Sequence, residues 1–433
     1  DITHHALLRQ LEYFNAEHGC AVVMETKTGE IRAISNLGRS DEGTYFEKRN
    51  YAIWESHEPG STFKLASLMV ALEDKAIDTS TVIDTDGGIM FIHGSKVEDS
   101  KRGGYGKISA ARVFEVSSNV GIVKLIREHY DNNPQKFYDK IEKFGFTKSI
   151  GFQIKGEGIP YIPNPKDKNR WNKISLEWMS WGYGISVTPM QTLMFYNAVA
   201  NNGVMVKPRF VKELRRQNKT VKKFTTEVLN PKIASEETLK KVRKVMENVV
   251  VRGTATNIYS PNFSMAGKTG TAKKYVSAHI NENGEKIPGQ YSSERYVASF
   301  AGFFPADNPK YTCIVIVHDP EKRKGYYGST VAAPIFKEIA QKIYTSTPID
   351  FQTVDDSMQF ASIENDFKNY EKLLQKEQDS VPNVIGMSGM DAVSLLENKG
   401  YKVKVSGVGK VKNQTFSKAE KELKGQTIIL KLN

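Results

Sequence analysis

Residues 65–72 form an apolar run, Leu-Ala-Ser-Leu-Met-Val-Ala-Leu, that directly follows the segment Pro59-Gly60-Ser61-Thr62-Phe63-Lys64. Pro and Gly end whatever structure precedes them, and the residues after them are strong helix formers with apolar character on every side. Such a helix is typically enclosed by its own domain, because it has no polar face to turn toward water. The sequence therefore predicts a buried helix whose first turn carries Ser61 and Lys64.

Ser61 and Lys64 are three residues apart, a spacing that places their Cβ atoms about 5 to 6 Å apart on one face of a helix. A serine hydroxyl is a poor nucleophile until a neighbouring base takes its proton, and a lysine acts as that base only when desolvation or nearby positive charge lowers its pKa. The apolar run supplies the desolvation, and the helix N-terminus supplies N–H groups where an oxyanion would develop. Ser-x-x-Lys alone is a weak signal, because a capping Ser followed by a solvated Lys has the same spacing.

Two further motifs strengthen the prediction. Ser117-Ser118-Asn119 follows an amphipathic segment, residues 109–116, which places it on a loop between helices. Lys268-Thr269-Gly270-Thr271 lies in a strand-like segment that is followed by two more strand-like runs. It is not a phosphate-binding loop, because Asn262 stands where that motif requires a glycine. As an isolated tripeptide, Lys-Thr-Gly is usually a hairpin turn.

In order and spacing, Ser-x-x-Lys, Ser-x-Asn and Lys-Thr-Gly resemble the signature of penicillin-recognising serine acyltransferases. The chain is similar to the transpeptidase domain of class B penicillin-binding proteins, and above all to the division-type enzymes that cross-link septal peptidoglycan. The resemblance runs through most of residues 1–345. It includes three more matching segments: 182–191, 201–204 and 328–334.

The pattern of the chain before residue 345 predicts an α+β fold, with a five-stranded antiparallel sheet flanked by helices and a helical subdomain. Residues 75–108 are rich in Gly, Asp and Lys and are expected to be loops, and residues 109–200 are expected to be mainly helical. The remaining elements are expected as helices at 2–18, 235–250 and 331–344, and as strands at 20–24, 31–34, 263–272, 296–304 and 311–317.

The composition shifts beyond Thr345, so we expect three parts: a transpeptidase domain over 1–349, a polar linker over 350–380 and a small αβ module over 381–433. The module resembles a PASTA domain, with a helix at 391–399. It departs from that family at Thr415-Phe416-Ser417, where Ser-Pro and a Gly-containing turn are usual. Its role is therefore left open between binding an anionic glycan or lipid and acting as a spacer.

The net charge of +12 and the pI of about 9.2 suit nucleic acid, an anionic membrane surface or an anionic wall polymer. No nucleic-acid-binding motif accompanies this charge, so nucleic acid is not an expected partner. Cys20 and Cys313 lie in apolar strand-like runs and are expected to be buried, inert thiols, with a disulfide left open. The chain begins at Asp1 and contains no apolar run of about 18 residues, so we expect a processed or truncated product.

The resemblance implies a two-step acyl transfer without metal or nucleotide cofactors. Ser61 would attack the penultimate D-Ala carbonyl of a D-Ala-D-Ala stem peptide, and Lys64 would be the general base. Ser117 would relay the proton to the leaving amine, while Asn119 would orient Lys64 and hold the substrate amide. The N–H groups of Ser61 and Thr271 would form the oxyanion hole. The terminal carboxylate would be bound by the Lys-Thr-Gly-Thr motif, which is Lys268, Thr269, Gly270 and Thr271.

The resemblance also implies stem peptides on lipid-linked or nascent glycan strands as substrates and β-lactams as covalent inhibitors. Expected partners are a membrane-embedded glycosyltransferase and division proteins, at the extracytoplasmic, periplasmic face of the cell membrane. Three alternatives share the motifs: a D,D-carboxypeptidase that uses water as acceptor, a serine β-lactamase, and a non-catalytic sensor of β-lactams or wall fragments. The rate of deacylation separates the lactamase, which turns penicillin over quickly, from a transpeptidase or sensor, which stays acylated.

Overall fold

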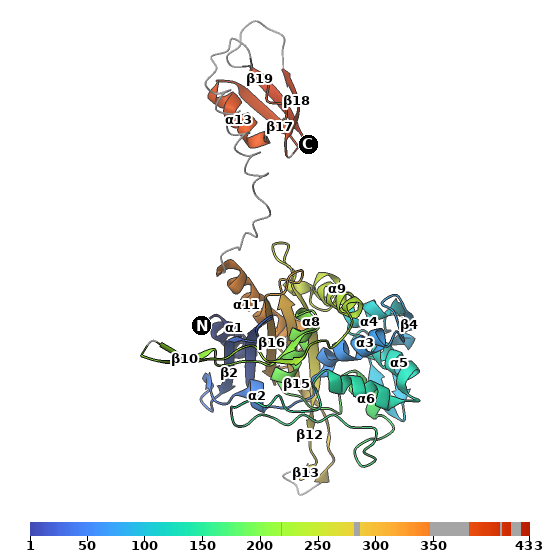
Figure 1. Cartoon of the computed structure of the whole chain (residues 1–433). Coiled ribbons are helices and arrows are strands. Elements are labelled where there is room, and N and C mark those ends of the chain that lie inside the picture. The colour runs from blue at the N-terminus through green and yellow to red at the C-terminus, as the bar shows by residue number, and fades with distance from the viewer. Residues whose placement is uncertain (218, 281–285, 347–380, 408, 417–425) are drawn as a thin grey trace. The chain divides into compact units, whose positions relative to one another are not determined.

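The computed structural model describes the chain except residues 218, 281–285, 347–380, 408 and 417–425 (Figure 1). It contains two compact units, Asp1–Thr347 and Pro348–Asn433. The expected linker, 350–380, lies outside the described residues, so the domain boundaries remain predictions.

A six-stranded antiparallel sheet forms the centre of the first unit, in the order β12-β15-β16-β1-β2-β3. Five of these strands match the prediction. The sixth, β3, has only three residues, too few for an alternating pattern to show in the sequence. The strands are β1 His18–Glu25, β2 Ile31–Arg39, β3 Tyr45–Glu47, β12 Ala266–Val276, β15 Gln290–Phe304 and β16 Tyr311–His318.

Helices cover both faces of this sheet. A Cβ on Gly19 of β1 would touch Leu11 of α1 (Ile2–Phe14), so this face of β1 lies against α1. On the opposite face, the Thr312 hydroxyl of β16 donates to Asn197 of α8 (Pro189–Ala200) over 2.9 Å. The last helix, α11 (Ala333–Ser346), lies beside α1 (Figure 1). Every residue of α8 is buried, as expected for a helix between a sheet and other helices.

The two cysteines lie on opposite faces of the sheet. Cys20 pairs with Ile316 and Cys313 pairs with Val23, so the two thiols occupy alternate positions of neighbouring strands. Successive side chains of a strand point to opposite faces, which keeps the two sulfur atoms apart. Both thiols are free and buried, as predicted, and burial raises the pKa of each well above its ordinary value.

The helical subdomain lies beside the edge strand β12, with α9 (Glu236–Arg252) packed along it. The expectation that residues 75–108 are loops was wrong. Here β5 (Ile89–Ile92) and β6 (Ser95–Glu98) form a hairpin, and β4 (Val82–Asp84) pairs with the more distant β7 (Lys107–Ser109). These strands are too short and too exposed to give a periodic pattern. The turn between β5 and β6 is His93-Gly94, where both residues have positive φ, as a two-residue hairpin requires.

The first helix is shorter than expected, because Asn15 adopts a left-handed conformation and ends it at Phe14. The remaining helices of this unit are α2 Tyr51–Trp54, η1 Gly60–Phe63, α3 Lys64–Glu73, η2 Asp86–Gly88, α4 Ala110–Glu115, α5 Asn119–Tyr130, α6 Pro134–Lys143, α7 Ser175–Ser180, α9 Glu236–Arg252, η3 Thr256–Ile258 and α10 Gly328–Val331. The short strands are β4 Val82–Asp84, β5 Ile89–Ile92, β6 Ser95–Glu98, β7 Lys107–Ser109, β8 Met205–Val206, β9 Glu213–Arg216, β10 Lys219–Lys223, β11 Val228–Asn230, β13 His279–Ile280 and β14 Lys286–Ile287.

The second unit contains one helix, α13 (Gly389–Asn398), and three strands in its described part: β17 (Lys402–Ser406), β18 (Val411–Phe416) and β19 (Thr427–Leu432). β19 lies between the other two, parallel to β17 and antiparallel to β18. The unit has a small core of its own. Within the described ranges, no helix of either unit is long and apolar enough to cross a membrane.

Candidate active site

The predicted buried helix is present, and it begins with a tighter turn. Ser61 lies on the 3-10 helix η1, and Lys64 is the first residue of α3. Gly60 has a φ of +54°, and its N–H donates to the carbonyl oxygen of Gly182 over 3.1 Å. A Cβ on Gly182 would lie 2.0 Å from the carbonyl oxygen of Gly60, so only glycine permits this approach. Together the two glycines hold the turn that presents Ser61.

Lys64 is fully buried, and its Nζ is held by Ser117, in the loop between α4 and α5, and by Asn119, the first residue of α5. Its Nζ donates to the carbonyl oxygen of Ser117 over 2.7 Å and to Oδ1 of Asn119 over 2.6 Å, and it lies 3.3 Å from Oγ of Ser117. Burial lowers the pKa of Lys64 to about 7, although the carboxylate of Asp99 acts in the opposite direction. A large fraction of this amine is therefore neutral near pH 7 and can accept a proton.

The Ser117 hydroxyl lies between two lysines. Nζ of Lys268 donates to Oγ of Ser117 over 2.8 Å and to the carbonyl oxygen of Thr269 over 3.0 Å. Burial, and then the charge of Lys64, lower the pKa of Lys268 well below its ordinary value. Ser117 itself has a φ of +59°, which is uncommon for a residue with a side chain and is often found at functional sites.

Asp99 holds Asn119 in place. Oδ1 of Asp99 accepts the N–H groups of Asn119, over 2.6 Å, and Val120, over 3.0 Å, and so caps the start of α5. Its Oδ2 accepts the Ser118 hydroxyl over 2.8 Å. The Asn119 amide donates to the carbonyl oxygen of Glu98 over 2.6 Å. Because its nitrogen is used in this way, the Asn119 side chain turns its oxygen toward Lys64.

The motif Lys268-Thr269-Gly270-Thr271 lies on β12, at the edge of the sheet and next to η1. A Cβ on Gly270 would lie 2.2 Å from the Ser299 hydroxyl and 3.0 Å from the side chain of Thr62 on η1. The strand can therefore approach the Ser61 turn only with glycine at this position.

The eight predicted site residues thus divide into two groups. Lys64, Ser117, Asn119 and Lys268 form one hydrogen-bonded cluster. The other four flank this cluster: Ser61 lies on η1, and Thr269, Gly270 and Thr271 lie on β12. The Thr269 hydroxyl lies 2.7 Å from that of Thr254, and the Thr271 hydroxyl accepts the N–H of Gly328 over 2.9 Å. Among the described residues, the Ser61 hydroxyl makes no hydrogen bond with the cluster.

Comparison with known families gives the same assignment. Residues 19–341 match the family described as penicillin binding protein transpeptidase domain. The chain belongs to the penicillin-binding protein transpeptidase family. Residues 379–433 match the PASTA domain, which confirms the predicted resemblance of the C-terminal module.

Curated relatives and solved structures are similar to this chain. Stage V sporulation protein D of Bacillus subtilis is 32% identical over 420 residues, which are 94% of this chain and 60% of the relative. Peptidoglycan D,D-transpeptidase FtsI of Escherichia coli is 28% identical over 368 residues, 83% of this chain and 57% of the relative. The chain therefore spans about three fifths of the length of each.

Among solved structures, the transpeptidase domain of penicillin-binding protein 3 from Burkholderia pseudomallei aligns with a TM-score of 0.65 and 25% identity, covering 81% of this chain and 95% of that one. Penicillin-binding protein 3 from Mycobacterium tuberculosis, complexed with aztreonam, aligns with a TM-score of 0.65 and 27% identity, covering 79% and 76%. The predicted α+β transpeptidase fold is thereby confirmed.

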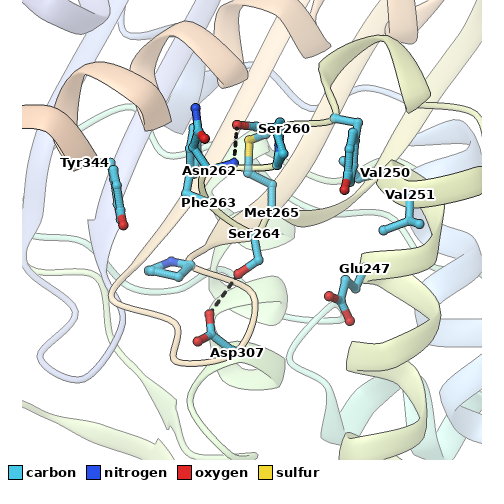
Figure 2. A pocket seen from close by; sticks show the side chains of 13 residues that line it. Glu247, Val250, Val251, Ser260, Asn262, Phe263, Ser264, Met265, Asp307 and Tyr344 are labelled. Atoms are coloured by element: carbon cyan, nitrogen blue, oxygen red, sulfur yellow. Dashed lines mark hydrogen bonds between the residues drawn. The ribbon is translucent and has the colours of Figure 1, made fainter. Parts of the chain in front are cut away.

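A hollow of the transpeptidase domain, about 450 Å³ in volume, lies between α9, the segment before β12 and the end of α11 (Figure 2). None of the candidate catalytic residues lines it. Its two carboxylates already have partners: Asp307 accepts the Ser264 hydroxyl over 2.8 Å, and Glu247 accepts Lys244 over 2.8 Å. Because the described residues that line it include no lysine and none of the predicted motif residues, we assign the chemistry to the Lys64 cluster, where burial lowers the pKa of the amine.

Sequence reasoning missed Asp99 and Gly182. Asp99 belongs to none of the recognised motifs and lies in the segment expected to be loops, and its contacts are with residues some twenty positions later. The sequence contains no local signal for such a contact. Gly182 was part of a matching segment, but its function as the partner of Gly60 depends on two backbones that meet only in the folded chain.

Proposed function

We propose that this chain is a serine D,D-transpeptidase that cross-links peptidoglycan stem peptides through an acyl-enzyme on Ser61. The observation that carries the proposal is a buried lysine, Lys64, with a pKa of about 7, three residues after Ser61 and hydrogen-bonded to Ser117 and Asn119. Relatives named peptidoglycan D,D-transpeptidase support the same reaction class.

In the first step, neutral Lys64 accepts the hydroxyl proton of Ser61 while Oγ bonds to the penultimate D-Ala carbonyl carbon. The carbonyl oxygen becomes an oxyanion, which the N–H groups of Ser61 and Thr271 stabilise. In other enzymes, one such donor contributes roughly 2.7 to 4 kcal/mol to the transition state. The position of Ser61 on a helical turn beside β12 supports this arrangement.

Collapse of the tetrahedral intermediate then breaks the C–N bond and expels the terminal D-Ala. Its amine takes the proton from Lys64 through the Ser117 hydroxyl, which the 3.3 Å contact between Lys64 Nζ and Ser117 Oγ supports. Lys268 and the Thr269-Gly270-Thr271 strand bind the substrate carboxylate, whose negative charge favours the protonated form of Lys268. The amine of a second stem peptide then attacks the ester, forms the cross-link and returns the proton to Ser61.

The chain then acts at the extracytoplasmic face of the cell membrane, in septal or spore-wall synthesis, together with a membrane-embedded glycosyltransferase and division proteins. One relative is named a peptidoglycan D,D-transpeptidase and another a stage V sporulation protein, which supports wall synthesis and the spore-wall alternative. β-Lactams acylate Ser61 in place of the stem peptide. The reaction uses no cofactor, because the chain's own amines and hydroxyls carry every proton.

Labelled penicillin tests the assignment directly. We expect mass spectrometry to place the label on Ser61 and the Ser61→Ala variant to remain folded and unlabelled. Ser67→Ala is the matched control, because Ser67 lies on the same apolar helix and only donates to the carbonyl oxygen of Ser180 over 2.7 Å. Label on a different serine of Ser61→Ala would contradict the proposal.

A stem-peptide donor mixed with a D-amino acid acceptor then separates the alternatives. A transpeptidase gives the aminolysed product, and a carboxypeptidase gives only the hydrolysed one. Rapid turnover of penicillin identifies a β-lactamase. A long-lived acyl-enzyme with neither peptide product identifies a sensor.

A further inference from the structure

Three side chains from distant parts of the sequence meet at one end of the central sheet. His18 is the first residue of β1, His318 is the last residue of β16, and the two are directly paired in the antiparallel register. Directly opposite residues point to the same face of a sheet, and here the two imidazoles stack with ring centroids 4.2 Å apart. Glu55, which follows α2, reaches both rings from above this face.

One oxygen of Glu55 faces both rings. Oε2 lies 2.7 Å from Nε2 of His18 and 3.5 Å from Nε2 of His318. The three atoms that could bind a metal ion lie within 4.8 Å of one another. In a tetrahedral zinc site with bonds of about 2.0 to 2.1 Å, neighbouring ligand atoms are about 3.3 Å apart. Both observed separations are within about 0.6 Å of that value, so small side-chain movements would open the space for an ion.

The two ring nitrogen atoms of His318 lack good hydrogen-bond partners among the described residues. Its side chain is almost fully buried, and Nδ1 has no hydrogen-bond partner among the residues that the structure describes. Its Nε2 is directed at Glu55, but 3.5 Å is long for an N–H···O hydrogen bond. Both nitrogen atoms of a buried imidazole usually have hydrogen-bond partners. The His318 ring therefore has a nitrogen atom that is available to bind a metal ion.

We propose that His18, Glu55 and His318 form a binding site for one divalent transition-metal ion, with Zn²⁺ as the best match. Two imidazoles and one carboxylate are a common zinc ligand set, and water completes the tetrahedron. The nitrogen ligands disfavour Mg²⁺ and Ca²⁺, which prefer oxygen. Glu17 lies 3.9 Å from Nδ1 of His18, on the side where zinc-bound histidines commonly meet an outer carboxylate. Glu55 is partly exposed and gives the ion a path of entry.

The site is connected to the segment that carries the nucleophile. Glu55 precedes Ser61 by six residues, and between them His57 forms a β-bridge with Val187, with N···O distances of 3.1 and 3.0 Å. A metal ion bound by the three ligands would therefore fasten this segment to the ends of β1 and β16. We therefore expect Zn²⁺ to stabilise the fold. Because the site lies outside the Lys64 cluster, this effect does not depend on which acyl acceptor the enzyme uses.

Co²⁺ titration of the metal-free chain tests the site, since tetrahedral Co²⁺ has visible d–d absorption bands. We expect one Co²⁺ per chain, displacement of the bands by Zn²⁺, and a higher thermal unfolding midpoint with Zn²⁺. Glu55→Gln and His318→Gln should each weaken Co²⁺ binding by at least about tenfold, since even the loss of an outer-shell partner typically costs that much. If His318→Gln does not fold, the partly exposed Glu55→Gln decides alone.

The double variant His4→Gln/His5→Gln is the matched control, because these adjacent histidines on α1 could bind metal by themselves. It should keep the bands and the thermal shift. Loss of the signal in this control, unchanged Co²⁺ affinity in folded Glu55→Gln, or the absence of stoichiometric binding to the wild-type chain would each overturn the proposal. Penicillin acylation, measured in parallel, reports the Ser61 site separately, so a failure of one assignment does not imply failure of the other.

Discussion

Replacement of Asp99 by Asn tests how the site sets the protonation of its base. Burial holds the pKa of Lys64 at about 7, and the Asp99 carboxylate acts against burial by raising that pKa. Asp99→Asn removes the negative charge but keeps a side chain of similar shape. The pKa of Lys64 should fall, and its neutral, proton-accepting form should persist to lower pH. We therefore expect the acidic limb of the pH profile for penicillin acylation to move to lower pH.

The wild-type pKa limits the size of the effect. A base with a pKa of about 7 is roughly one-tenth neutral at about pH 6 and roughly nine-tenths neutral at about pH 8. Relative to its own plateau, the variant can therefore gain up to about tenfold near pH 6 and almost nothing near pH 8. The plateau itself should fall, because Asp99 also caps α5 through Asn119 and Val120. A charge at a helix N-terminus contributes about 0.3 to 1 kcal/mol, and up to ~2 kcal/mol when partly buried.

The assay is stopped-flow acylation by a fluorescent penicillin, with each variant normalised to its own plateau from about pH 5 to about pH 9. Ser118→Ala is the control, since it removes one hydrogen bond to Asp99, of 2.8 Å, and leaves the charge in place. Its plateau can fall, but its acidic limb should stay where it is. A limb that does not move in Asp99→Asn, or that moves to higher pH, would refute the electrostatic account of Lys64.

Three further predictions concern the framework of the site. Lys64→Arg should abolish acylation in a folded protein, because guanidinium does not deprotonate and cannot serve as a base; wild-type acylation rates in this variant would remove Lys64 from the mechanism. Gly182→Ala should slow acylation and lower the unfolding free energy by about 1 to 3 kcal/mol, because its Cβ would meet the Gly60 carbonyl at 2.0 Å at a φ of +89°; an equilibrium denaturation curve unchanged from wild type would contradict this. Truncation after Thr347, the end of the first compact unit, should leave the second-order rate of penicillin acylation within about threefold, under ~0.7 kcal/mol in barrier terms; a larger fall in a folded truncation would contradict it.

The parts of the site that the sequence predicts are those encoded by short strings. Ser61 and Lys64 are one helical turn apart, Ser117 and Asn119 lie two residues apart at the start of α5, and Lys268 begins a strand motif. Each of these short motifs can be recognised from neighbouring residues alone, and the order of the motifs along the chain produces the resemblance to the family. The helix and main strands are predicted for the same reason, since their hydrophobic patterns span many residues.

What the sequence did not predict depends on contacts between distant segments. Asp99 caps a helix that starts twenty residues later, and His18 meets His318 only because β1 and β16 are neighbours in the sheet. The same sheet register also resolves the cysteine question, since it places Cys20 and Cys313 on opposite faces. Periodicity gives the orientation of residues within one strand, but it does not say which strands pair.

The burial of Lys64 is itself an argument for chemistry. Its pKa falls from 10.5 to about 7 on folding, so between these values the unfolded chain binds a proton that the folded chain does not. This lowers stability most fully below about pH 7, and the loss is recovered as the pH rises toward 10.5. At 1.36 kcal/mol per pKa unit, the shift corresponds to about 5 kcal/mol, a large part of the net stability of an ordinary domain. An apolar side chain would fill the same space without that cost. Lys268, a second buried amine that donates to the Ser117 hydroxyl, also has a lowered pKa. Perturbed pKa values of this kind cluster where side chains bind substrate and move protons.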